Sequence, residues 1–76
     1  MNNPRRKAID AIKEKLESLK EDLENLLAEE EEYRDNMPEN LQGSERYEKA
    51  EEACDNLQSA IDSMDEALEY LSEATN

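Results

Sequence analysis

Large apolar residues recur three and four positions apart on both sides of a short polar segment. In the first part of the chain they are Ile9, Ile12, Leu16, Leu19, Leu23, Leu26, Tyr33 and Met37, with Glu30 as the one interruption. In the second part the alternation is unbroken, at Tyr47, Ala50, Cys54, Leu57, Ile61, Met64, Leu68 and Leu71. This heptad spacing is typical of helices that pack along a narrow apolar seam. The pattern therefore predicts two long helices.

The polar segment between the two patterns contains Pro38 and the only glycine, Gly43. Proline removes a backbone donor and glycine tolerates positive φ, so a helix is expected to end here and another to begin. Asn3 and Pro4 suit the start of the first helix, and Ser44 is suited to cap the second. The predicted domain spans residues 1–76, with a helix at 4–37, a turn at 38–43 and a helix at 44–74.

The two apolar seams can be matched in antiparallel order across the short turn. The register that aligns them places Leu23 opposite Leu57 and Leu26 opposite Cys54. A connection of this length is common in helical hairpins. The predicted fold is all-α, an antiparallel two-helix hairpin that resembles a short coiled coil.

The charges at the helix ends favour the same antiparallel order. The first helix begins with Arg5, Arg6 and Lys7, which is the wrong sign for the positive end of its own dipole. Antiparallel pairing is expected to bring these cations near Glu69 and Glu73 at the end of the second helix. Exposed pairs of this kind are worth only about 0.3 to 0.5 kcal/mol each, so they select orientation more than they stabilise the fold.

Small residues beside the second seam suggest that two hairpins associate. Two helices from a 76-residue chain with 36% apolar residues cannot enclose a full core, and self-association is the expected remedy. The expected dimer-packing residues are an alanine every seven positions and one leucine beside the first seam: Ala53, Ala60, Ala67, Ala74 and Leu27. The sequence predicts a homodimer or a higher oligomer, with two hairpins forming a four-helix bundle.

The net charge of −13 limits the partners that the surface can attract. Residues 1–20 carry six basic and three acidic side chains, a local sum of +3, which leaves −16 for the rest of the chain. We expect such a surface to repel nucleic acids and anionic membranes and to attract a basic protein. There is no apolar run of membrane-spanning length and only one cysteine, so a cytoplasmic location is predicted.

Acidic residues of the second helix form a ladder on the side away from the seam. The candidate protein-binding acids are Glu48, Glu52, Asp55, Asp62, Glu66 and Glu69. One interpretation is a mimic of nucleic-acid phosphates that occupies a basic groove on a host protein. The other is a solvated outer face that keeps a small helical protein soluble. The sequence leaves both interpretations open.

The cationic cluster Arg5, Arg6 and Lys7 also has two interpretations. Free backbone N–H groups and three cations at a helix start could bind a phosphate, and several copies together could hold a nucleotide signal. In that case the protein would act as an oligomeric sponge for a small nucleotide. The alternative is pairing with the acidic end of the second helix.

Two tyrosines and two arginines flank the turn and form a candidate recognition tip. Tyrosine and arginine are over-represented among the residues that dominate binding, and loops often carry function. The four residues are Tyr33, Arg34, Arg46 and Tyr47. The alternative is that they close the end of the hairpin, and a purely structural adaptor with no recognition tip is a third possible function.

Nothing in the sequence indicates catalysis. The chain has no histidine, and Cys54 falls at a seam position where a small apolar residue is expected. Glu30 lies opposite Ala50 in the predicted register, where a polar residue can fix alignment. Neither di-metal nor calcium-loop spacing is present. We therefore expect a non-enzymatic protein without a metal or cofactor.

The stretch around the turn resembles a group of small acidic helical-hairpin proteins. The resemblance is carried by the string YRDNMPENLQGSERYEKAEEA at residues 33–53. Proteins of this kind are encoded by Clostridium-type bacteria and their phages, and most are uncharacterised. The resemblance implies a mobile-element protein in a bacterial host cell, with a host-takeover or anti-defence role. It implies no catalytic or ligand residues.

Overall fold

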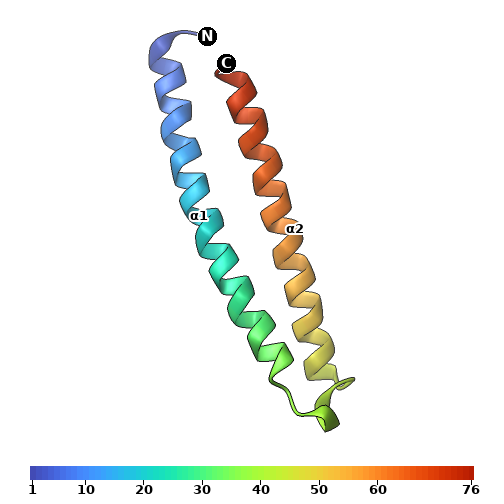
Figure 1. Cartoon of the computed structure of the whole chain (residues 1–76). Helices are drawn as coiled ribbons and strands as arrows, with labels where there is room; N and C mark the ends of the chain where they lie inside the picture. The colour runs from blue at the N-terminus through green and yellow to red at the C-terminus, as the bar shows by residue number, and fades with distance from the viewer.

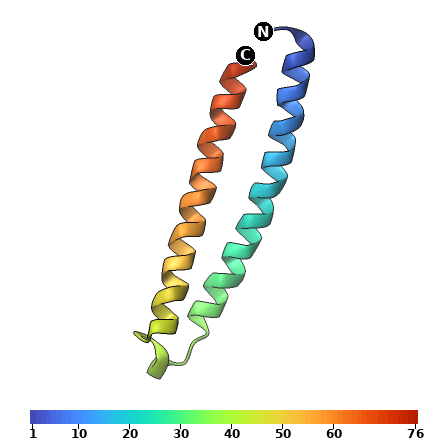
Figure 2. The same ribbon diagram turned by 180° about the vertical axis from the view of Figure 1, so that it is seen from behind.

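A computed structural model describes residues 1–76 as two long antiparallel helices. Helix α1 spans Asn3–Asp35, a short 3-10 helix η1 spans Glu39–Leu41, and helix α2 spans Glu45–Ala74 (Figure 1). The molecule is a rod of 59 × 15 × 13 Å. Its two termini lie together at the end away from the turn (Figure 2). The prediction of an all-helical fold with two helices packed together is confirmed.

The helix starts are set by side-chain caps. The Asn2 side chain accepts a hydrogen bond from the backbone N–H of Arg5 at 2.8 Å, so the cap lies one residue earlier than the expected Asn3. Ser44 Oγ accepts from the N–H of Tyr47 at 3.3 Å, and this cap is confirmed. Each cap satisfies one of the donors that a helix start leaves free. Helix α1 ends at Asp35, slightly before the predicted boundary at residue 37.

The turn reverses the chain by means of Pro38 and Gly43. The carbonyl of Pro38 accepts from the N–H of Leu41 at 2.8 Å and so closes the single turn of η1. Gly43 follows at φ +88°, a backbone conformation that is costly for residues with a side chain. The Ser44 N–H then bonds to the carbonyl of Leu41 at 3.0 Å. The break between Pro38 and Gly43 is therefore where the sequence predicts it.

The α2 side of the contact follows the predicted seam. Ala50, Cys54 and Ile61 are buried, with exposed fractions of 3%, 4% and 4%. The other predicted seam residues are half-buried: Tyr47, Leu57, Met64, Leu68 and Leu71. The alternation of three and four positions on α2 therefore describes its contact with α1 correctly.

On α1 the predicted seam is only half correct. The row of Ile9, Leu16, Leu23 and Met37 faces α2 as expected, since all four are buried or half-buried. The second row of α1 in the contact is not the predicted one. It consists of Arg6, Lys13, Lys20, Leu27 and Arg34. The expected companions remain about half exposed, at 55% for Ile12, 56% for Leu19, 53% for Leu26 and 48% for Tyr33.

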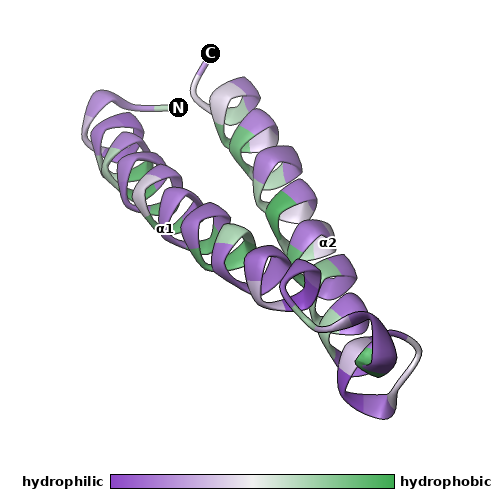
Figure 3. Cartoon of the chain, turned by 60° about the horizontal axis from the view of Figure 1, so that its bottom comes forward, coloured by the Kyte–Doolittle hydropathy of each residue, from purple (hydrophilic) through white to green (hydrophobic).

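The rotation places the row that contains Leu27 against α2 and leaves the row of Ile12, Leu19 and Leu26 outside the contact. A single antiparallel partner covers only two adjacent rows of a helix, so one of these two rows must stay outside. Leu27 enters the core with Cys54 and Ile61. Lysine and arginine can fill the rest of the same row because their aliphatic stems lie on apolar surface while the charged ends reach water. Figure 3 shows the hydrophobic segments as interrupted patches on two mainly hydrophilic helices.

The register also differs from the predicted one. Lys20 Nζ forms an ion pair with Asp65 Oδ1 at 2.5 Å, whereas the predicted register places Lys20 level with Ala60. Leu27 shares a core cluster with both Cys54 and Ile61, whereas the predicted register places it level with Ala53. The predicted alignment of the two helices was therefore wrong by about one helical turn.

Candidate binding surfaces

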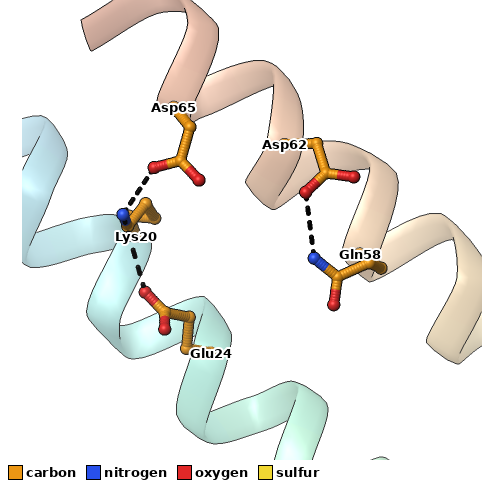
Figure 4. Close-up of polar contacts among 5 residues, drawn as sticks. All are labelled: Lys20, Glu24, Gln58, Asp62 and Asp65. Carbon is orange, nitrogen blue, oxygen red and sulfur yellow. Dashed lines mark hydrogen bonds and ion pairs between the residues drawn. The ribbon is translucent and has the colours of Figure 1, made fainter.

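The acidic ladder of α2 lies in water and is free of cations. Its six members, Glu48, Glu52, Asp55, Asp62, Glu66 and Glu69, are all exposed. None of them takes part in any of the four ion pairs of the molecule. The one side-chain hydrogen bond to the ladder comes from an uncharged donor: Gln58 Nε2 donates to Asp62 Oδ1 at 3.0 Å (Figure 4). The ladder is therefore available to a basic partner.

The cationic cluster at the start of α1 does not contact the end of α2 as expected. Arg5 and Lys7 are exposed, and none of the three cations forms an ion pair with Glu69 or Glu73. Arg6 is half-buried, and its Nη1 donates to Asn3 Oδ1 at 3.5 Å. The expected pairing is therefore not formed: Arg6 donates to Asn3 of its own helix, and Arg5 and Lys7 stay in water.

The single ion pair between the helices lies near the middle of the rod. Lys20 Nζ is 2.5 Å from Asp65 Oδ1 and 3.9 Å from Glu24 Oε1 (Figure 4). The hydrogen bond to Asp65 raises the pKa of Lys20. Reasoning from the sequence missed this pair, because Lys20 lies in the seam only after α1 is rotated.

The four residues of the candidate recognition tip differ in how far they are exposed. Tyr47 and Arg34 lie half-buried in the seam, and Arg34 Nε donates to Asp35 Oδ1 at 2.9 Å. This hydrogen bond raises the pKa of Arg34. Tyr33 and Arg46 are instead exposed, and both line a hollow near the turn. A recognition role for these four residues therefore stays a prediction.

A hollow of about 430 Å³ lies between the helices close to the turn. Its lining residues are Glu30, Tyr33, Glu45, Arg46, Lys49 and Ala50. Glu30, Ala50 and Arg46 all line this hollow, and Glu30 forms no ion pair. The cation of Lys49 pairs with Glu45 of its own helix at 3.3 Å. The hollow therefore contains charges of both signs and one exposed aromatic ring.

Cys54 occupies the core position that the pattern predicts. Its thiol is free and buried. Burial raises the pKa of the Cys54 thiol, and the positive charge of Arg34 opposes part of this effect. A thiol with a raised pKa carries little thiolate at neutral pH, so this environment does not activate a nucleophile.

The expected dimer-packing residues fall into two groups. Ala60, Ala67 and Ala74 are exposed and Ala53 is half-buried, so the alanine row remains available to another chain. Leu27 is 8% exposed and packs inside the hairpin, which corrects its expected place on the outer flank. The residues missed on that flank are Ile12, Leu19, Leu26 and Tyr33. The signal that could have identified them is Leu27 next to Leu26, because only one of these two leucines can face α2.

No group of carboxylates and thiol in the molecule is arranged to hold a metal ion. The apolar stretches of α1 and α2 are too short and too interrupted by charge for either helix to cross a membrane. Comparison with protein-family models, with curated proteins and with solved structures finds no match to this chain. The resemblance to acidic hairpin proteins of bacteria and phages therefore stays a prediction.

Proposed function

We propose that this chain is a non-enzymatic binding protein that engages a basic surface of a host protein through the acidic ladder of α2. The observation that supports this is the state of the ladder: six exposed carboxylates along one helix, none paired with a cation. Unpaired charge of one sign raises the encounter rate with surfaces of the opposite sign. A phage or mobile-element accessory role, including anti-defence, rests on the resemblance of residues 33–53.

A matched pair of charge variants tests the ladder. One variant neutralises its six acids to the corresponding amides. The control neutralises six acids of α1, namely Asp10, Glu14, Glu17, Glu21, Glu24 and Glu31, so that both variants have the same net charge. Both are compared with the wild type as bait in lysate of the bacterial host, with mass spectrometry of the captured proteins.

The expected result is a basic protein that binds the wild type and the α1 control, and that is lost with the ladder variant. Binding should weaken as salt is raised, because exposed charges are screened over about 8 Å at physiological ionic strength. Equal loss in the two variants would show that only net charge matters. Retention by the ladder variant would contradict the proposal.

We also propose that the hairpin functions as a homodimer or a higher oligomer, with two copies forming a four-helix bundle. Only five of 76 residues are buried, and none of the large side chains is completely buried. Two helices that bury so little gain much from a second pair. Sedimentation equilibrium at micromolar concentration tests this, and a mass of one chain would contradict it.

A nucleotide sponge is the second candidate function, and one observation favours it. Arg5 and Lys7 have no carboxylate partner, so the cations at the start of α1 remain free for an anion. A thermal-shift panel of mono-, di- and cyclic nucleotides tests it. A ligand at 100 times its dissociation constant should stabilise the fold by about 2.7 kcal/mol, and Arg5→Gln with Lys7→Gln should abolish the shift.

A further inference from the structure

Helix α1 carries a row of large apolar side chains on one flank of its contact with α2. The row consists of Ile12, Leu19, Leu26 and Tyr33, which are between 48% and 56% exposed. Residues seven apart on a helix recur about every 10.5 Å along one side. The four side chains therefore form a straight ridge over most of the length of α1.

The alanine row of α2 lies on the same side of the hairpin as this ridge. The hollow near the turn shows this directly, since Tyr33 from the ridge and Arg46 both line it. Arg46 occupies the position seven residues before Ala53, and therefore begins the alanine row. Lys20 and its partner Asp65 lie across the seam, on the other side. We call this surface the apolar flank: Ile12, Leu19, Leu26, Tyr33, Ala53, Ala60, Ala67 and Ala74.

Acidic residues are scarce around the apolar flank, although the chain has 22 of them. The row next to the alanines on α2 has no carboxylate: Lys49, Asn56, Ser63 and Tyr70. The row next to the ridge on α1 has two, Asp22 and Glu29. Depletion of charge is characteristic of the centre of a protein interface. A basic partner would be expected to face acids, whereas a second copy with charge −13 requires a contact that lacks them.

The hairpin exposes more surface than a compact monomer of its mass, and the excess is close to the area that one protein interface buries. The accessible surface is 5717 Å², whereas a compact monomer of this mass exposes about 4,800 Å². The excess of about 900 Å² is close to the roughly 800 Å² that each partner buries in a standard interface. One copy of the same flank can therefore cover this excess.

The apolar flank is complementary to itself. Because Lys20 lies level with Asp65, Leu19 lies level with the interval between Ala60 and Ala67. Ile12, Leu19 and Leu26 each face an interval between two alanines of α2, and Tyr33 faces the interval between Arg46 and Ala53. A two-fold axis parallel to the helices would place α1 of one copy over α2 of the other, so that each ridge residue enters such an interval. This arrangement also brings the basic start of α1 near the acidic end of α2 of the second copy.

We infer that the apolar flank is the homodimer interface and that α1 of each copy packs against α2 of the other in antiparallel order. The inference rests on the proposed self-association and specifies its surface and geometry. The two hairpins then place their turns at the same end of the bundle. The acidic ladders stay on the outside, where a basic partner can reach them.

Leu19→Glu together with Leu26→Glu tests the surface. Both side chains are half exposed in the single hairpin, so helix content by circular dichroism should stay close to that of the wild type. The dissociation constant of the dimer, from sedimentation equilibrium, should rise by at least about 30-fold, as expected for residues at the centre of an interface. Ala28→Glu is the control, since Ala28 is exposed on α1 away from the flank and its substitution should leave the dimer intact.

The outcomes separate this inference from the proposed function. A wild-type chain that stays monomeric would overturn both self-association and the interface. A wild-type dimer that persists in the double variant would overturn only the assignment to the apolar flank. If Ala28→Glu dissociates the dimer as strongly as the double variant does, added charge alone is the cause and the assignment fails.

Disulfide formation tests the geometry, with Cys54→Ala as the background. Chains with Leu19→Cys are mixed with chains with Ala67→Cys and oxidised. A disulfide requires two Cα atoms within about 7 Å, so the inferred arrangement should give the mixed product in excess over either homodimer. An axis perpendicular to the helices would instead pair each variant with itself. Homodisulfides in excess, or none at all, would overturn the inferred arrangement.

Discussion

The half of the hairpin next to the turn and the half that holds the termini differ in how much they bury. All five buried residues belong to the turn half: Leu27, Met37, Ala50, Cys54 and Ile61. In the open half the seam residues of both helices are at most half-buried: Ile9, Leu16, Met64, Leu68 and Leu71. The spacing of the seam residues on α2 is the same in both halves, but near the turn they include the small and buried Ala50 and Cys54.

Helix α1 adds to the difference through the row that accompanies its apolar residues in the seam. Near the turn this row contributes Leu27, which packs with Cys54 and Ile61. Toward the termini it contributes Lys20 and Lys13, whose charged ends must remain in water. The turn half therefore supplies most of the stability of a single hairpin. The open half gains more from a contact outside the hairpin.

The largest expected effect comes from truncating one core residue in each half. Ile61→Ala removes a side chain that is 4% exposed and should lower the free energy of unfolding by about 2–4 kcal/mol. Leu68→Ala removes a half-buried side chain and should cost about half as much. Urea unfolding followed by circular dichroism measures both. Equal losses would show that the two halves do not differ in packing.

A smaller effect is expected at Gly43, where the turn half is closed. A left-handed conformation costs a residue with a side chain about 1–2 kcal/mol, and Gly43 has φ +88°. No atom lies within 4 Å of an added Cβ, so the loss in Gly43→Ala should come from the backbone alone. Gly43→Asn is the control, since asparagine tolerates this region better and should lose less. If Gly43→Asn and Gly43→Ala lose the same stability, the backbone conformation is not the cause and the prediction is wrong.

The sequence predicts the two helices, the turn and the α2 seam because each depends on local signals. Pro38, Gly43 and Ser44 act within a few residues of themselves, and the period of α2 leaves one apolar stripe. The rotation of α1 could not be predicted in the same way. The row of Ile9, Leu16 and Leu23 can be completed on one side by Ile12, Leu19 and Leu26, or on the other by the row of Lys20 and Leu27, and the choice depends on where Lys20 and Leu27 meet α2.

The candidate surfaces could likewise be predicted only where they depend on the pattern of one helix. The acidic ladder follows from the α2 pattern, and its exposure agrees with the predicted side. The ridge of Ile12, Leu19 and Leu26 was assigned to the seam, because a heptad pattern alone does not show which of two adjacent rows faces the partner helix. The ion pair of Lys20 with Asp65 depends on the register, which differs by about one turn from the predicted one.

A third effect, expected above neutral pH, concerns the thiol in the turn half. Burial raises the pKa of Cys54 in the folded chain above its ordinary value of 9.0. The unfolded chain therefore loses this proton first, and the free energy of unfolding should fall as pH rises above about 9. Urea unfolding between pH 7 and 10.5 should show a steeper fall for the wild type than for Cys54→Ala. Identical slopes would mean that other groups account for the pH dependence.

The smallest effect is expected from the ion pair that joins the helices in the middle of the rod. The carboxylate of Asp65 is about half exposed, so Asp65→Asn should change the urea midpoint little, and the change should shrink further as salt is added. Lys49→Met is the control, because it removes an ion pair within α2 and not one between the helices. A large, salt-sensitive loss that is confined to Asp65→Asn would show that the open half depends on this pair. The difference in stability between the two halves would then have to be explained by charge and not by apolar burial.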